Sequence, residues 1–223
     1  MDKSVKEDTY DNLWRDDEKA YSAEHLGYTP HFVRFMQKWA KPRAKAASQA
    51  LEVGCGDGFF SSKLSDLGYK VTGIDLSPLA IANARNKYKE IQFQVHDLEN
   101  PLPFHDSTFD LVWCSEVLEH LYFPGFALDE IYRVLSSGGI FLCTVPFHGV
   151  IKNLGIALFA FERHYDPTYP HVRFFTKRSL GNLVSAVGLD VREIKHCGSG
   201  LGLRDIFVPT NILLAAGKCD ATQ

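Results

Sequence analysis

The stretch Leu51-Glu52-Val53-Gly54-Cys55-Gly56-Asp57-Gly58 decides the fold of this 223-residue chain. It begins as a short apolar strand that the glycines stop, and apolar residues at helical spacing follow it. Glycine lets the backbone approach a ligand closely, and the first turn of the helix offers free N–H groups. The stretch predicts a strand–loop–helix unit whose loop holds a ligand; a glycine-rich turn without a ligand is the alternative.

The residues around this loop indicate the kind of ligand. A dinucleotide-binding loop reads G-x-G-x-x-G, whereas here Phe59 stands where the third glycine would be. Glu52 lies two residues before the first glycine, where its carboxylate would repel a pyrophosphate and attract a cation. The sequence therefore favours a cationic ligand over a nicotinamide dinucleotide.

Strand-like and helix-like segments alternate from Ala50 onward, which predicts an α/β domain with a mostly parallel sheet. Strands are expected over 50–53, 71–75, 91–95, 111–114, 140–145, 191–194 and 212–216. Residues 1–45 are charged, carry scattered aromatics and are expected to form a helical segment ahead of the main domain, 46–223. The stretch 147–175 is too long for a plain connection, which indicates a functional insertion.

Two further acids support a ligand site next to the glycine loop. Asp75 ends the second expected strand, where a carboxylate can accept both hydroxyls of a ribose. Asp97 ends the third and can accept a hydrogen bond from an exocyclic amine. With Glu52, three acids follow three successive strands, whose carboxyl ends meet at the crevice where open α/β sheets bind ligands.

Composition narrows the class of protein. The formal net charge is −3, so a protein whose main task is to grip nucleic-acid phosphates is disfavoured. Hydrophobic residues make up 45% of the chain, enough for a sizeable core. The five cysteines include no C-x-x-C pair, and we find no signal peptide or membrane span, so a cytoplasmic location is expected.

The sequence resembles the class I S-adenosylmethionine-dependent methyltransferases, and in particular the family of the ubiquinone-biosynthesis O-methyltransferases. The resemblance covers about Ala50 to Ala216. Besides the glycine loop, it rests on Gly73-Ile74-Asp75-Leu76-Ser77, Phe109-Asp110-Leu111-Val112, Glu116-Val117-Leu118-Glu119-His120 and Arg133-Val134-Leu135-Ser136-Ser137-Gly138-Gly139. It implies a Rossmann-like, doubly wound sheet of seven strands whose last strand is antiparallel.

The resemblance also implies S-adenosylmethionine as cofactor and a role for each matching residue. The loop residues Gly54, Cys55 and Gly56 would hold the methionine end, with Glu52 on the ammonium side. Asp75 would bind the ribose, Leu76 would pack on the adenine face, and Asp97 with Leu98 would take the adenine edge. Ser115 would face the sulfonium.

The catalytic candidates are His120 and His171. If Glu116, Glu119 and His120 lay on one helix, their spacing would bring them to a shared face beside the methyl group. Some quinone-pathway O-methyltransferases and small-RNA 2′-O-methyltransferases have a similar cluster and bind a divalent ion through it. In the RNA enzymes a further histidine completes the cluster, and His171 resembles that histidine. The sequence therefore leaves two alternatives. Either the cluster binds a divalent ion, or Glu119 is solvated and His120 only packs in the site.

Two segments are expected to close over the site. The N-terminal segment would bring Trp14 or Tyr21 to the cofactor side, and the insertion, acting as a substrate cap, would bring His164 or Tyr165 to the acceptor side. A desolvated crevice favours transfer, because water competes with the acceptor. The alternative for the N-terminal segment is that it packs on the back of the sheet.

We therefore expect an S-adenosylmethionine-dependent methyltransferase that acts on a hydroxyl of a small-molecule or glycan-linked acceptor. An RNA 2′-O-methyltransferase is the second choice, which a basic surface stripe would favour. A nicotinamide-dependent oxidoreductase and a non-catalytic binding module are the other classes considered. The sequence names neither the acceptor, nor the atom methylated, nor the oligomeric state.

Overall fold

The computed structural model describes residues 10–12, 14–15, 22–147, 149–159, 161, 172–198 and 209–219. The strands are β1 (Gln49–Val53), β2 (Lys70–Asp75), β3 (Gln92–Val95), β4 (Phe109–Ser115), β5 (Leu135–Pro146), β6 (Leu189–Cys197) and β7 (Asn211–Lys218). The α-helices are α3 (Thr29–Ala40), α4 (Phe59–Asp66), α5 (Pro78–Lys87), α6 (Pro124–Val134), α7 (Val150–Phe159) and α9 (Lys177–Ala186). Short 3-10 helices cover η1 (Ala23–His25), η2 (Lys41–Arg43) and η3 (Leu118–His120).

The strands form one seven-stranded sheet in the order β3-β2-β1-β4-β5-β7-β6. Strands β1 to β5 pair in parallel, and β7 lies antiparallel between β5 and β6. This topology confirms the expected Rossmann-like sheet with an antiparallel last strand. The strand order reverses direction beside β1 and β4, which is where doubly wound sheets bind ligands.

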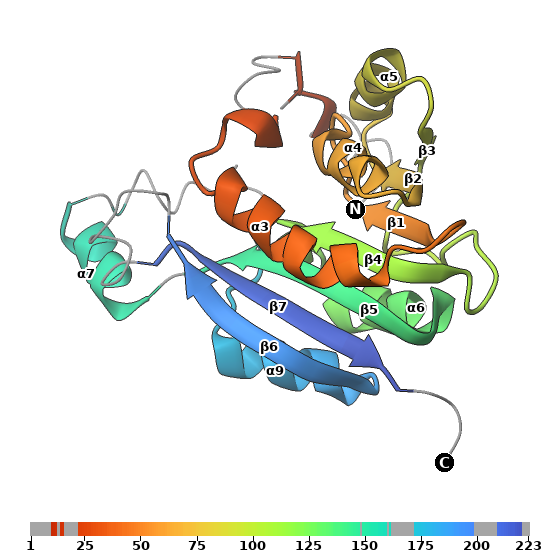
Figure 1. Cartoon of the computed structure of the whole chain (residues 1–223). Helices are drawn as coiled ribbons and strands as arrows, with labels where there is room; N and C mark the ends of the chain where they lie inside the picture. Colours follow the sequence, from red (N-terminus) through yellow and green to blue (C-terminus); the bar gives the residue numbers. More distant parts are fainter. Residues whose placement is uncertain are drawn as a thin grey trace.

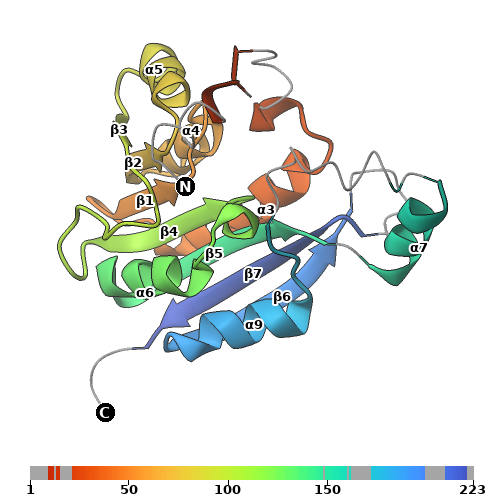
Figure 2. The same ribbon diagram turned by 180° about the vertical axis from the view of Figure 1, so that it is seen from behind.

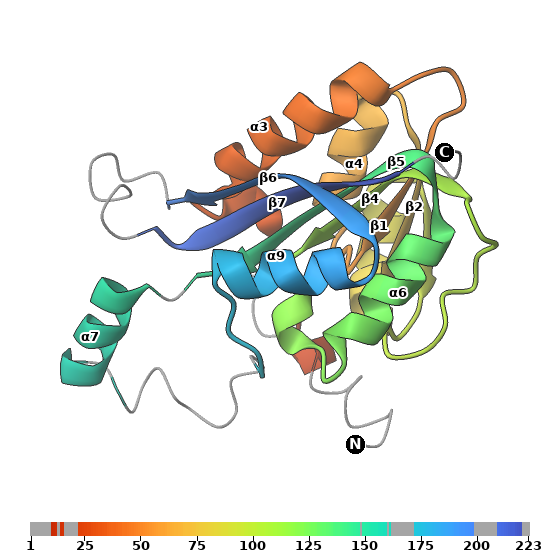
Figure 3. The same cartoon turned by 90° about the horizontal axis from the view of Figure 1, so that it is seen from below.

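Helices cover both faces of the sheet, as Figure 1 and its reverse view in Figure 2 show. Helices α3 and α4 lie on one face and α6 and α9 on the other, which is clearest in Figure 3. Alternate residues of the same strand supply the two cores: Trp113 packs under α3 and α4, whereas its neighbours Val112 and Cys114 pack under α6 and α9. Both layers therefore fix the strand ends that carry the site.

Some element boundaries differ from the sequence expectation. Helix α6 ends at Val134 and Leu135 begins β5 at once, where it pairs with Phe109. The fifth strand thus starts five residues before Ile140, and a register shift between Phe109 and Leu111 absorbs the change. Leu135 is buried, as an apolar residue of either a helix or a strand would be, so its burial does not mark the boundary between α6 and β5.

The insertion is described in part. Helix α7 projects from the body of the molecule (Figures 1 and 3) and exposes large apolar side chains, among them Val150, Leu154 and Phe159. At the base of the insertion, Phe147 and Phe175 form an isolated bridge. None of the helices in the described part of the chain has both the length and the apolar character that a bilayer crossing requires.

Candidate active site

A cavity of about 380 Å³ opens at the carboxyl ends of β1, β2 and β4. The nine residues proposed to bind the cofactor lie at the strand ends and in the loops that follow, and all nine line the cavity. The full set that lines it from this group is Glu52, Gly54, Cys55, Gly56, Asp75, Leu76, Asp97, Leu98 and Ser115. The structure thus brings all of these sequence candidates to one place.

The glycine loop is shaped so that only glycine fits at its first position. Gly54 has φ of +69°, and a Cβ there would lie 2.2 Å from Cγ2 of Val117. The N–H groups of Gly54 and Cys55 both donate to the carbonyl of Ile74, at 2.8 and 2.9 Å, which ties the loop to β2. The loop is therefore a fixed wall of the cavity, with its backbone close to any ligand inside.

Asp75 organises the same loop from the end of β2. Its Oδ2 accepts the N–H of Gly56 and its Oδ1 accepts the N–H of Ser77, both at 2.9 Å. Burial raises the pKa of Asp75, while these backbone hydrogen bonds partly offset that effect by favouring the carboxylate. The side chain therefore fixes the position of the glycine loop as well as facing the cavity.

Glu52 is the most enclosed of the acids in the loop region, with 2% of its surface exposed. The hydroxyl of Ser61, on α4, donates to its Oε2. Burial raises the pKa of Glu52 well above its ordinary value, and the Ser61 hydrogen bond opposes that rise. A cation in the cavity would stabilise the ionised form of this group.

The charge of the lining is one-sided. Six acids face the cavity, whereas no lysine or arginine of the described residues does; the acids are Glu52, Asp57, Asp75, Asp97, Glu116 and Glu119. S-adenosylmethionine carries a sulfonium and an ammonium against one carboxylate, so its net charge suits these acids, whereas a dinucleotide pyrophosphate would be repelled. The residues present therefore fit the cofactor that the family resemblance implies.

The Glu116–His120 segment is not the helix that the spacing suggested. Glu116 has φ of +54°, a left-handed conformation that is uncommon outside glycine, and only Leu118–His120 form a 3-10 turn. Its Oε1 accepts the Thr144 hydroxyl at 2.9 Å, and its Oε2 accepts the Asn211 amide at 3.0 Å. The expectation of a shared helix face was wrong, because these distant partners hold Glu116 in a loop instead.

Glu119 and His120 both line the cavity. Oε1 of Glu119 lies 3.8 Å from Nε2 of His120. Burial, and then the nearby Glu116, raise the pKa of Glu119 well above its usual range. The ring of Tyr10 meets that of His120 edge-to-face, at 6.0 Å between centroids.

The proposed metal cluster is described only in part. Among the residues that the structure describes, no three His, Cys, Asp or Glu side chains are grouped to hold an ion. His171, which would complete the cluster, lies outside the described residues, as do His164, Tyr165 and Tyr21. Of the insertion, the described part contributes no residue to the cavity lining.

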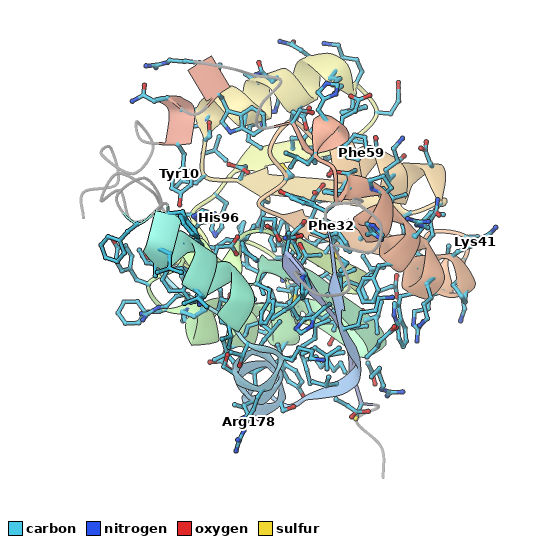
Figure 4. The ribbon with its side chains drawn as sticks, turned by 90° about the vertical axis from the view of Figure 1, so that its left-hand side faces the viewer. Tyr10, Phe32, Lys41, Phe59, His96 and Arg178 are labelled. Carbon is cyan, nitrogen blue, oxygen red and sulfur yellow. The ribbon has the colours of Figure 1, made fainter. Side chains whose placement is uncertain are left out.

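The N-terminal segment lies over the cofactor side of the cavity. Tyr10 and Trp14 line it, and a Cβ on Gly56 would lie 2.9 Å from the Trp14 ring. In Figure 4, Tyr10 lies close to His96, another residue of the lining, and far from Lys41 at the end of α3. This segment therefore forms part of the cavity wall.

Asp11 and Ser22 make polar contacts that attach the described part of that segment to the main domain. Asp11 caps the start of α5: its Oδ1 accepts the Ser77 hydroxyl and, at 3.2 Å, the N–H of Leu79. The Ser22 hydroxyl donates to Asp57 at 2.9 Å. Sequence reasoning missed Asp11, Thr144 and Asn211; for Thr144, a lone polar residue in an apolar stretch was the available signal.

Known proteins resemble this chain in sequence and in fold. The model of the methyltransferase domain family matches residues 51–143. A ubiquinone biosynthesis O-methyltransferase from Pseudomonas entomophila is 30% identical, over 70% of this chain and 71% of the relative. One from Hydrogenovibrio crunogenus is 28% identical, over 88% and 81%. The crystal structure of an S-adenosylmethionine-dependent methyltransferase from Mesorhizobium loti superposes with a TM-score of 0.67 at 18% identity, over 88% of this chain and all of that one.

These findings agree with the geometry of the cavity. The match to the relative from Pseudomonas entomophila extends over 169 residues, and the solved structure shares the fold. The acidic lining of the cavity suits a cationic cofactor, and the strand order is that of a doubly wound sheet. The chain belongs to the class I S-adenosylmethionine-dependent methyltransferases, and S-adenosylmethionine is its cofactor.

Proposed function

We propose that this enzyme transfers the methyl group to a hydroxyl oxygen of a small-molecule or glycan-linked acceptor. The relatives named ubiquinone biosynthesis O-methyltransferase support an oxygen acceptor. The observation that carries the proposal is the lining of the cavity by six acids without a described lysine or arginine. Such a lining attracts the cationic cofactor and repels polyanions such as RNA, so a small acceptor is favoured over an RNA chain.

In this proposal the cofactor is held at both ends by residues that line the cavity. Bound S-adenosylmethionine supplies an electrophilic methyl group on its sulfonium. The backbone of Gly54, Cys55 and Gly56 accommodates the methionine end, and Asp75 accepts the ribose hydroxyls. The adenine end is proposed to contact Leu76, Asp97 and Leu98, while Ser115 faces the methyl group.

His120 is the proposed base. Methylation of a hydroxyl is faster when a neighbouring group removes its proton, and an imidazole suits that task near neutral pH. Its ring lies in the cavity with 18% of the side chain exposed, and the Glu119 carboxyl lies 3.8 Å from Nε2, where its ionised form would stabilise the protonated ring. His171 stays a second candidate.

The N-terminal segment is proposed to act as a lid. Tyr10 and Trp14 cover the cofactor side, and Asp11 fastens them to α5. A lid that excludes water strengthens each electrostatic contact inside the cavity and holds the reactants close together. The insertion is proposed to cap the acceptor side.

The experiment that tests the proposal is methyl labelling of a metabolite extract. The enzyme is incubated with the extract and cofactor carrying an isotopically labelled methyl, and labelled products are identified by mass spectrometry. We expect the label on a hydroxyl oxygen of a small molecule. Label found only on nitrogen, on carbon or on RNA would contradict the proposal.

A variant pair tests the base. His120→Gln should lower kcat by about a hundred-fold or more with little change in cofactor affinity, because proton removal contributes on that order. His25→Gln, an exposed histidine on η1, serves as the matched control and should keep its rate. Equal turnover in the two variants would exclude His120 as the base.

A further inference from the structure

A second cavity lies away from the cofactor site and has the opposite charge. It has a volume of about 640 Å³ and lies between α3 and the adjoining ends of β6 and β7. Figure 3 shows α3 running alongside these two strands. Its described lining is His31, Arg34, Phe35, Lys38, Lys195, His196, Cys197, Gly198, Pro209 and Leu213, a set without aspartate or glutamate.

The cations of this cavity outnumber the carboxylates that pair with them. Glu193 serves two of them: Lys38 Nζ lies 2.5 Å from its Oε2 and Lys195 Nζ lies 3.3 Å from its Oε1. Arg34 donates to the carbonyl of Pro30 at 3.1 Å and has no carboxylate partner among the described residues. One carboxylate against three cations leaves about two positive charges uncompensated at the cavity.

The sequence concentrates positive charge in α3 and in the residues that follow it. Residues 26–51 contain no aspartate or glutamate, but they include five lysines and arginines in a chain whose net charge is −3. Arg34 and Lys38 are four residues apart, so they lie on one face of α3 and repel each other. A bound anion would turn that repulsion into attraction.

The side chains are also held in place for an anion. The Lys195 ammonium lies 5.0 Å from the centre of the Phe35 ring, which positions it at the wall of the cavity. Phe35 and Leu213 give the cavity an apolar base, so charge contacts there are less screened than on an open surface. Arg34 offers the planar fork that phosphate oxygens match.

We infer that this cavity binds a phosphate group, held by the Arg34 guanidinium and by the ammonium groups of Lys38 and Lys195. Two uncompensated positive charges match a phosphate dianion better than a single carboxylate. The group comes either as free phosphate or as the phosphate of a small monoester. A nucleic-acid backbone is disfavoured, because the three cations converge on one cavity while acids surround the cofactor site.

The test is a calorimetric titration of the full-length chain, at roughly 150 mM salt so that unspecific attraction is screened. Inorganic phosphate and glycerol 3-phosphate are titrated separately, and the tighter ligand tells free phosphate from a monoester. Saturable binding of either at one site per chain is the expected result. Arg34→Gln should weaken it by about ten-fold or more, because a bidentate, charge-assisted contact is lost.

The matched control is Lys41→Gln, which lies within the same basic stretch at the C-terminal end of α3 but outside the cavity lining. Figure 4 shows Lys41 extending outward at that end of α3. This variant should bind phosphate as the wild type does, and both variants should keep their affinity for S-adenosylhomocysteine. No saturable binding, equal weakening in the two variants, or tighter binding of a single-stranded RNA oligonucleotide than of either phosphate would overturn the inference.

Discussion

Two acids of the cofactor cavity are held in place by hydrogen bonds within the fold. Asp75 accepts the N–H groups of Gly56 and Ser77, so it holds the glycine loop while facing the cavity. Glu116 is similarly fixed by Thr144 and Asn211 and faces the same space. Because the protein already directs these carboxylates, a cationic ligand meets them without reorganisation.

Replacing Asp75 tests the proposed ribose anchor. Loss of a buried charged acceptor costs about 1.5–3 kcal/mol, so Asp75→Ala should weaken S-adenosylmethionine binding by ten-fold or more. The control is Asp66→Ala, an exposed acid on α4 that pairs with Lys63. Calorimetry on folded proteins makes the comparison, and unchanged affinity in Asp75→Ala would remove Asp75 from the binding site.

The buried Glu52 should make the free energy of unfolding depend on pH. Its pKa is raised by burial above the ordinary 4.5, so folding favours the protonated form. The stabilisation is complete below the unfolded pKa and is lost as the pH rises through the folded pKa. Without cofactor, the free energy of unfolding should therefore fall less steeply with pH in Glu52→Gln than in the wild type.

The measurement is urea unfolding of both proteins at about pH 5 and about pH 8. Glu90→Gln, an exposed acid before β3, provides the control and should follow the wild type. The Glu52→Gln variant should gain stability relative to the wild type between the two pH values. Parallel curves for all three proteins would mean that Glu52 ionises in the folded state as it does in the unfolded chain.

At the scale of elements, the N-terminal segment and the start of α5 are connected through one side chain. Asp11 supplies an acceptor to Ser77 and to Leu79 N–H at the helix start, and Trp14 then lies against Gly56. The Asp11→Ala variant should release the segment and weaken cofactor binding several-fold. The melting temperature should change little, since Ser77 still caps α5 through Ala80 N–H.

Asn12→Ala is the neighbouring control, because Asn12 is exposed and bonds only to Arg15 among the described contacts. Stopped-flow measurement of cofactor release separates the two variants, with faster release expected for Asp11→Ala alone. If Asp11→Ala instead lowers the melting temperature and leaves the release rate unchanged, the segment is a packing element and not a lid.

How much of the structure the sequence predicts also depends on the element. The strand ends at Glu52, Asp75 and Asp97 follow from local alternation and from the turn residues after each strand, so the cofactor side of the cavity was predictable. The loop at Glu116 was not. Its conformation depends on Thr144, 28 residues away, and on Asn211, 95 residues away, and no local pattern encodes such partners.

Across the whole molecule, charge is divided between two cavities. The described lining of the cofactor cavity includes six acids, and that of the cavity beside α3 includes cations and no acid. The formal net charge of −3, which disfavoured a nucleic-acid-binding protein, conceals this division. Each cavity therefore selects a ligand by a charge that the average over the chain does not reveal.

The most direct test of the acidic cofactor site is a calorimetric comparison of three ligands with the full-length chain. S-adenosylmethionine and its demethylated product, S-adenosylhomocysteine, should each bind at one site, and NAD should not bind measurably. The cationic cofactor should also lose affinity in Asp75→Ala. Binding of NAD as tight as that of S-adenosylmethionine, or no binding of S-adenosylmethionine by the folded chain, would contradict a site built for a sulfonium.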